Sequence, residues 1–156
     1  MGMKLTTSHL NEKQNILFVC TGNINRSPAA EIMLRQLTHE FNADSAGISD
    51  AKHGKTTKKM MEALERKGFI SEPVKSNKIT KEQFDWADII YYMQPSHLKS
   101  LQDCFPAEDM SKAKPLVMYS TTGLKKIIDP HFDGRHDLAL DQLLECLHNM
   151  LYMIGI

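Results

Sequence analysis

The sequence has few cysteines, and they show no pairing. Cys20, Cys104 and Cys146 stand far apart in a chain of 156 residues. Three cysteines without close spacing form neither a disulfide framework nor a zinc-binding pattern. We therefore expect reduced thiols and no metal site.

An excess of either charge is also absent. Lys and Arg together number 19, as do Asp and Glu, so no general electrostatic attraction to nucleic acid or to a membrane surface is expected. The longest apolar run, near the C-terminus, is interrupted by Glu145, His148 and Asn149, and the first residues contain no hydrophobic signal core. These features predict a cytoplasmic protein without a membrane span, whose partners must be inferred from a site.

Short apolar segments alternate with helical patterns along the chain. Strand-like segments lie at 15–20, 43–47, 88–93 and 115–120, and apolar residues at helical spacing occur at 30–41, 60–68, 95–101 and 140–154. This alternation predicts an α/β fold, a single three-layer domain over residues 14–156 with a central four-stranded parallel sheet flanked by helices on both faces. Residues 1–13 are polar and lack periodicity, and we expect a flexible extension there.

The segment VCTGNINRSP joins the first predicted strand to the first predicted helix. Ser27 suits the N-cap of that helix and Pro28 its first turn. A loop that enters a helix in this way turns several backbone N–H groups toward one centre, where the helix dipole adds positive charge. Arg26 adds a planar pair of donors, and Gly22 and Asn23 tolerate the positive φ angles of a curled loop. The pattern predicts a cradle for phosphate or another oxyanion.

Cys20 ends the strand directly below this cradle. The same positive field favours the thiolate over the thiol, which makes Cys20 a candidate nucleophile. Ser27 can donate its hydroxyl to that thiolate. A small buried hydrophobic residue is the usual role of an isolated cysteine, but the accompanying Arg26, Ser27 and Gly22 favour the nucleophile.

The motif FVCTGNINRSPAAE resembles the signature loop of the low-molecular-weight protein tyrosine phosphatases. The segments SAG (45–47), FDWADIIYYMQPSHLKSL (84–101) and IIDPHFDGRHDL (127–138) resemble further parts of that family in the same order. The resemblance implies a phosphomonoesterase that uses a cysteine nucleophile, a phosphocysteine intermediate and no metal or other cofactor. It further implies hydrolysis of phosphotyrosine on proteins, or of aryl phosphates. The partner would then be a tyrosine-phosphorylated protein, with a bacterial tyrosine kinase as one candidate.

The resemblance also implies roles for individual residues. Asp129, in the segment DPHFDG, corresponds to the general acid of the family, and one carboxyl group can serve as acid and then as base. The Asp-Pro pair selects Asp129 over Asp133. Ser45 corresponds to a serine that helps to fix Asn23. The catalytic residues expected are Cys20, Arg26 and Asp129, and the residues expected to bind substrate are Thr21, Gly22, Asn23, Ile24, Asn25, Ser27, His131 and Phe132.

The chain departs from the family pattern at several positions. Asn25 stands where a second loop cysteine is usual, so no protective disulfide with Cys20 is expected. Ala51 replaces an aromatic residue that forms one wall of the substrate site, and Val74 replaces a histidine that supports the loop. Ile24 is apolar, as in tyrosine-directed members, whereas a phosphoarginine-directed branch has threonine there. The missing wall weakens the case for phosphotyrosine, and Ile24 favours aryl substrates.

Two alternatives share this loop. An arsenate reductase of the same fold would need further thiols close to Cys20, and the spacing of Cys104 and Cys146 does not suggest such a relay. A phosphate-recognition module with little turnover would need neither a nucleophile nor Asp129. Both alternatives are less consistent with the sequence than a phosphatase.

Overall fold

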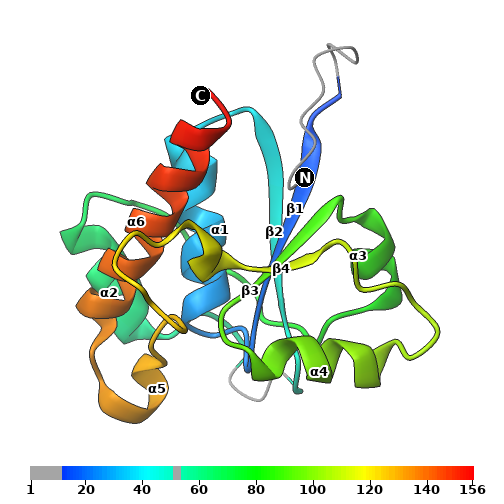
Figure 1. Ribbon diagram of the computed structural model, residues 1–156. Coiled ribbons are helices and arrows are strands. Elements are labelled where there is room, and N and C mark those ends of the chain that lie inside the picture. The colour runs from blue at the N-terminus through cyan, green and yellow to red at the C-terminus, as the bar shows by residue number, and fades with distance from the viewer. Residues whose placement is uncertain (1–11, 51–53) are drawn as a thin grey trace.

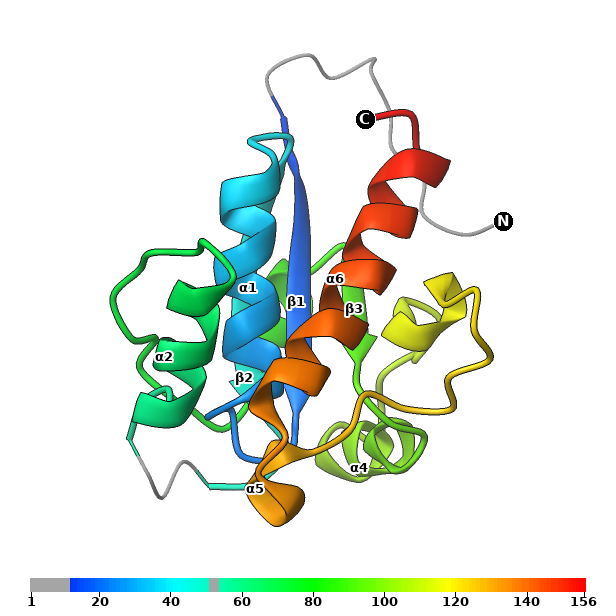
Figure 2. The ribbon, with the colours of Figure 1, turned by 90° about the vertical axis from the view of Figure 1, so that its left-hand side faces the viewer.

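The computed structural model, which describes residues 12–50 and 54–156, contains four parallel strands in the order β2-β1-β3-β4. Helices lie on both faces of this sheet (Figures 1 and 2). The expected three-layer α/β fold is therefore confirmed. The strands are β1 (Gln14–Cys20), β2 (Phe41–Gly47), β3 (Ile89–Tyr92) and β4 (Ala113–Pro115). The α-helices are α1 (Arg26–Leu37), α2 (Lys58–Arg66), α3 (Lys81–Trp86), α4 (Ser96–Cys104), α5 (Pro130–Asp133) and α6 (His136–Met153), and a 3-10 helix, η1, covers Leu116–Tyr119.

The central strand β1 carries apolar side chains on both of its faces. Because side chains alternate along a strand, Ile16 and Phe18 join the core beneath α1, α2 and α6, whereas Leu17 and Val19 join the core beneath α3 and α4. All four are fully buried. This explains why the segment 15–20 reads as a continuous apolar run, which is typical of a parallel strand covered on both sides.

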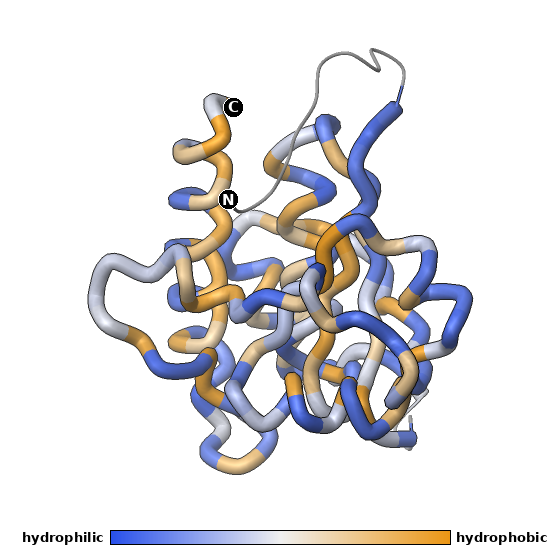
Figure 3. The backbone as a smooth tube through the Cα atoms, turned by 45° about the vertical axis from the view of Figure 1, so that its right-hand side comes forward, coloured by the Kyte–Doolittle hydropathy of each residue, from blue (hydrophilic) through white to orange (hydrophobic). Residues whose placement is uncertain are grey.

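The final helix, α6, packs one apolar stripe against the sheet layer. Leu140, Leu143, Leu147 and Met150 are all fully buried. In Figure 3 hydrophobic and hydrophilic segments alternate along this helix, as a period of 3.6 residues requires. None of the helices in the described part of the chain combines the length and the apolar character needed to cross a membrane.

The expected fourth strand is present as β4, but its predicted bounds of 115–120 are wrong. The strand ends at Pro115, which pairs with Tyr92, and the chain continues as η1. Proline has no N–H group with which to extend the ladder. In η1 the buried residues Leu116 and Tyr119 lie three apart, which puts both on the same side of a 3-10 turn. The Tyr119 hydroxyl then meets that of Tyr91 at 2.7 Å.

The predicted start of the first helix is also wrong. Asn25, and not Ser27, occupies the N-cap of α1, and the helix begins at Arg26. The Ser27 hydroxyl is directed to Cys20 and to the carbonyl oxygen of Ala46 instead. The strand before this helix, β1, begins at Gln14. The extension predicted over residues 1–13 lies, for its first eleven residues, outside the described part.

Candidate active site

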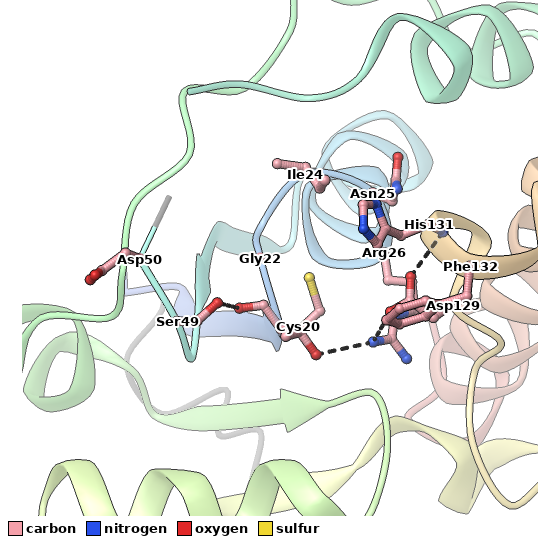
Figure 4. Close-up of a pocket in the computed structure, with 11 residues that line it drawn as sticks. Cys20, Gly22, Ile24, Asn25, Arg26, Ser49, Asp50, Asp129, His131 and Phe132 are labelled. Atoms are coloured by element: carbon pink, nitrogen blue, oxygen red, sulfur yellow. Dashed lines mark hydrogen bonds and ion pairs between the residues drawn. The ribbon is translucent and has the colours of Figure 1, made fainter. Parts of the chain in front are cut away.

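A pocket opens where the C-terminal end of β1 meets the N-terminus of α1. In the strand order β2-β1-β3-β4, the connection after β1 leads to one side and the connection to β3 leads to the other. The direction of the connections therefore reverses between β1 and β3, and open α/β sheets bind ligands at the C-terminal ends of the strands at such a point. The pocket has a volume of about 270 Å³, near the lower limit for small-molecule sites. Figure 4 shows Arg26, Asp129 and Phe132 close together on one side of Cys20, and Ile24 on the loop away from them.

Cys20 presents its sulfur to the start of α1. The Ser27 N–H group donates to Cys20 Sγ at 3.4 Å, and Ser27 Oγ lies 2.9 Å from the same sulfur. Both contacts come from Ser27, and its N–H group is a hydrogen-bond donor aimed at the sulfur. Cys20 is 3% exposed, yet it lines the pocket. The sulfur is therefore open to a small ligand and to little else.

Asn23 holds the loop in its curled shape. It is the one residue other than glycine with a positive φ, 55°, in the described part of the chain. Its amide donates to Ser27 Oγ at 2.8 Å and to Ser45 Oγ at 3.0 Å, while its Oδ1 accepts from the backbone N–H of Asn77 at 3.0 Å. Ser76 Oγ donates to the carbonyl oxygen of Asn23. The side chain thus compensates for an unfavourable backbone conformation by tying it to β2 and to the segment before α3.

A buried carboxylate supports this network from behind. Ser45 Oγ donates to Glu31 Oε1 at 2.6 Å, and Arg35 pairs with Glu31 Oε2 at 2.8 Å. Burial raises the pKa of Glu31, partly offset by the Ser45 hydrogen bond and by the charge of Arg35. Sequence reasoning did not single out Glu31, although its position one helical turn after Ser27 placed it on the sheet-facing side of α1.

Arg26 is held by one nitrogen and offers the other to the pocket. Its Nη1 donates to Gln94 Oε1 at 2.7 Å and to the carbonyl oxygen of Ile127 at 2.8 Å. Its Nη2 lies 3.3 Å from Asp129 Oδ2. Arg26 is 1% exposed, so its guanidinium group is fixed before any ligand arrives.

Asp129 lies across the pocket from Cys20, at the N-cap of α5. Its Oδ1 accepts from the backbone N–H of His131 at 3.0 Å, which aims its Oδ2 at Arg26. The neighbouring Phe132 is 84% exposed and makes an edge-to-face contact with the His131 ring. Such an exposed aromatic residue beside a pocket suits contact with a ligand.

Of the residues predicted for the site, nine line the pocket and three lie behind it. Asn23, Ser27 and Ser45 are buried behind the loop. The remaining lining residues, Ser49 and Asp50, follow β2 and were not predicted. Ala51, on which the prediction of a missing aromatic wall depends, lies outside the described residues.

His97, in α4, was not predicted either, and it fastens the loop to β3. The backbone N–H of Met93 donates to His97 Nδ1 at 3.2 Å, so the ring proton is on Nε2, which donates to Thr21 Oγ1 at 3.0 Å. Burial, together with the nearby charge of Arg26, lowers the pKa of His97 to about 3. Its neutral ring connects the ends of β1 and β3.

We expect the free energy of unfolding of the His97→Asn variant to fall less at acidic pH than that of the wild type. The pKa of His97 is lower in the folded chain than its ordinary value of 6.5, so its contribution to stability is present above pH 6.5 and declines as the pH falls toward 3. When the pH is lowered from 7.5 to 5.0, the wild type should lose about 2 kcal/mol more of its free energy of unfolding than the variant does, so the difference between them should narrow by that amount. Urea unfolding at both pH values measures it, with His148→Asn, at an exposed position in α6, as the control. An unchanged difference would contradict the neutral, buried state of His97.

Comparison with known proteins identifies the family to which this architecture belongs. The family model for low molecular weight phosphotyrosine protein phosphatase matches residues 15–152. The low molecular weight protein-tyrosine-phosphatase Ptp of Acinetobacter johnsonii is 34% identical over 126 residues, covering 81% of this chain and 84% of its own. A protein-arginine-phosphatase of Bacillus subtilis is 32% identical over 143 residues, covering 87% and 93%.

Solved structures lead to the same family. The crystal structure of YfkJ from Bacillus subtilis superposes with a TM-score of 0.85 at 27% identity, covering 92% of this chain and 96% of its own. The matched region includes the loop after β1, the ends of the strands and the Asp129 segment. The chain is therefore a member of the low molecular weight phosphotyrosine protein phosphatase family.

Proposed function

We propose that this protein hydrolyses phosphotyrosine on proteins through a phosphocysteine intermediate. The observation that carries the proposal is the meeting of Cys20, Arg26 and Asp129 in one small pocket at the N-terminus of α1. A nucleophile, a fixed cation and a carboxyl group are the three components that phosphoryl transfer to a thiolate requires.

In the first step, Cys20 Sγ attacks phosphorus while the bond from phosphorus to the tyrosine oxygen breaks. The Asp129 carboxyl group gives its proton to the departing oxygen. Backbone N–H groups of residues 21–26 and the Arg26 guanidinium group bind the phosphoryl oxygens. In the second step, water attacks phosphorus, Asp129 takes a proton from that water, and Cys20 leaves as a thiolate. The Ser27 hydroxyl, 2.9 Å from the sulfur, stabilises that leaving group.

The pocket rim supports an aromatic substrate. Phe132 and His131 provide one wall, in the positions where we predicted substrate contacts. Ile24 contributes an apolar edge at the loop. Stacking of a phenyl ring on Phe132 is worth about 1 kcal/mol, so these residues favour an aryl ester over an alkyl one.

The position of the other thiols argues against an arsenate reductase. Neither Cys104 nor Cys146 lines the pocket. Cys146 is fully buried in α6, and burial raises its pKa to about 12. Cys104 packs with the core on the opposite face of the sheet from Cys146. A thiol relay needs a second sulfur that can reach the first.

The proposed partners are tyrosine-phosphorylated proteins, with a bacterial tyrosine kinase as one candidate. The proposal also places the reaction in the cytoplasm, where thiols remain reduced. Both statements rest on the proposed chemistry at Cys20.

The test is a comparison of substrates with the wild-type protein. Matched peptides that carry phosphotyrosine, phosphoserine or phosphoarginine are supplied in the presence of a chelator, and phosphate release is measured. We expect kcat/KM for phosphotyrosine to exceed that for phosphoserine by at least about tenfold, from ring stacking and the better leaving group. Faster hydrolysis of the phosphoarginine peptide would instead assign the specificity that the Bacillus subtilis relative is named for.

A further inference from the structure

The side chain of Asn25 does not make the hydrogen bond that is usual for an asparagine at its position in the loop. Asparagine at a helix N-cap usually accepts a hydrogen bond from a backbone N–H of the first turn. Asn25 occupies the N-cap of α1, but its side chain makes no such bond. The residue is 3% exposed and lines the pocket. An amide that is nearly buried and yet not used as a cap requires another role.

Thr57 anchors the oxygen end of this amide. Thr57 Oγ1 donates to Asn25 Oδ1 at 2.5 Å, and the backbone N–H of Thr57 donates to the carbonyl oxygen of Ile24 at 3.0 Å. Thr57 is itself the N-cap of α2, because its Oγ1 accepts from the N–H of Met60 at 3.2 Å. Since that oxygen already accepts from Met60, its own proton is available for Asn25. The orientation of the amide is therefore determined by α2.

The nitrogen end of the amide is left for the pocket. Asn25 Nδ2 has no hydrogen-bond partner among the described residues. Within the described ranges, no side-chain nitrogen is both sealed from solvent and without a partner. Asn25 Nδ2 must therefore reach solvent. Asn25 lines the pocket beside Cys20 and Arg26, so the pocket is the solvent-filled space that this residue is known to reach.

We propose that Asn25 Nδ2 donates a hydrogen bond to an oxygen of the bound phosphoryl group, in addition to the donors of the loop backbone and Arg26. This inference rests on the proposed phosphatase function and assigns to this chain a specific binding residue. The site takes a tetrahedral oxyanion, such as the phosphoryl group of the substrate or free phosphate. The donor is neutral, and Thr57 holds it in place before the ligand binds, which lowers the entropy cost of the contact.

The substitution Asn25→Ala removes the donor. We expect the dissociation constant for inorganic phosphate to rise by about tenfold or more, the usual effect of losing one hydrogen bond to a charged ligand. Isothermal titration with phosphate measures this directly, without turnover. The inhibition constant of phosphate against para-nitrophenyl phosphate should rise by the same factor.

Variants at Thr57 separate binding from stability. Thr57→Val removes the anchor and the cap, and we expect phosphate binding to weaken by about threefold; Thr57→Ser keeps the hydroxyl and should restore it. The matched control is Thr80→Val, which removes the N-cap of α3 and does not touch the loop. It should lower the melting temperature much as Thr57→Val does and leave the dissociation constant for phosphate unchanged. The double variant Asn25→Ala with Thr57→Val should bind phosphate no more weakly than Asn25→Ala alone.

The outcomes distinguish this inference from the proposed function. Unchanged phosphate binding in Asn25→Ala, with the wild type active, overturns the inference and leaves the phosphatase proposal in place. A wild type that binds phosphate without hydrolysing any ester contradicts the proposed function, while the binding measurements still decide the role of Asn25. If phosphate binding in the double variant were weaker than in Asn25→Ala by the full factor that Thr57→Val causes alone, the anchoring of Asn25 by Thr57 would be contradicted.

Discussion

Replacing Cys20 with serine is expected to reduce the hydrolysis of para-nitrophenyl phosphate by at least four orders of magnitude. A serine hydroxyl at this position lacks the nucleophilicity of a thiolate, and the contacts from Ser27 cannot ionise it. The loop and Arg26 are unchanged, so the variant should still bind phosphate and gain thermal stability from it. The measurement is steady-state turnover with a chelator present, together with thermal unfolding with and without phosphate.

The control is Cys104→Ser, in α4, which lies outside the pocket and should retain wild-type turnover. If the protein were an arsenate reductase that uses Cys104, this variant would lose arsenate reduction instead. Turnover that persists in Cys20→Ser would disprove the phosphocysteine mechanism. Loss of phosphate binding in that variant would show that the substitution had disrupted the loop as well.

Replacing Asp129 with alanine is expected to lower kcat/KM for phenyl phosphate, which reports the step in which the phenol leaves, by about two to four orders of magnitude, the usual range for a general acid. The loss should be smaller for a substrate such as 2,4-dinitrophenyl phosphate, whose leaving group departs without a proton. This dependence on the leaving group is a property of an acid and does not follow from a disturbed fold. Asp129 Oδ2 also contacts Arg26 Nη2 at 3.3 Å, so phosphate binding should be measured in the same variant.

Asp133→Ala is the matched control, since Asp133 lies four residues further on and pairs with Arg135 on the surface. It should leave kcat/KM close to the wild-type value for both esters. Equal losses for the two leaving groups in Asp129→Ala would contradict the role of proton donor. A large loss in Asp133→Ala would instead move that role to the second carboxylate.

The α/β architecture could be predicted because each strand and helix carries its own periodic signal. The run 15–20 and the stripe through α6 were both recognised from apolar spacing alone. The fourth strand was misplaced because LVMY is apolar and β-prone, and only the end of the ladder at Pro115 and the buried pair in η1 decide its conformation. The helix start was misplaced because Ser27 is a good N-cap residue that the fold uses to contact Cys20.

The residues that fasten the site together were harder to predict. His97 and Thr57 stand 77 and 37 positions after Cys20 in the sequence, and each has an ordinary local role at a helix start. Their contacts with Thr21 and Asn25 exist only because the ends of β1 and β3 and the N-terminus of α2 meet at one edge of the sheet.

The sequence by itself determined the short-range features: a cysteine at the end of a buried strand, an arginine six residues later and a helix directly after them. These features are local, so chain connectivity alone brings them together. Only the tertiary structure decided which distant side chains meet them, namely Asp129 beside Arg26, a neutral His97 beneath Thr21, and Thr57 against Asn25. Such partners depend on the packing of separate elements, since hydrogen bonds across long stretches of chain leave no spacing pattern in the sequence.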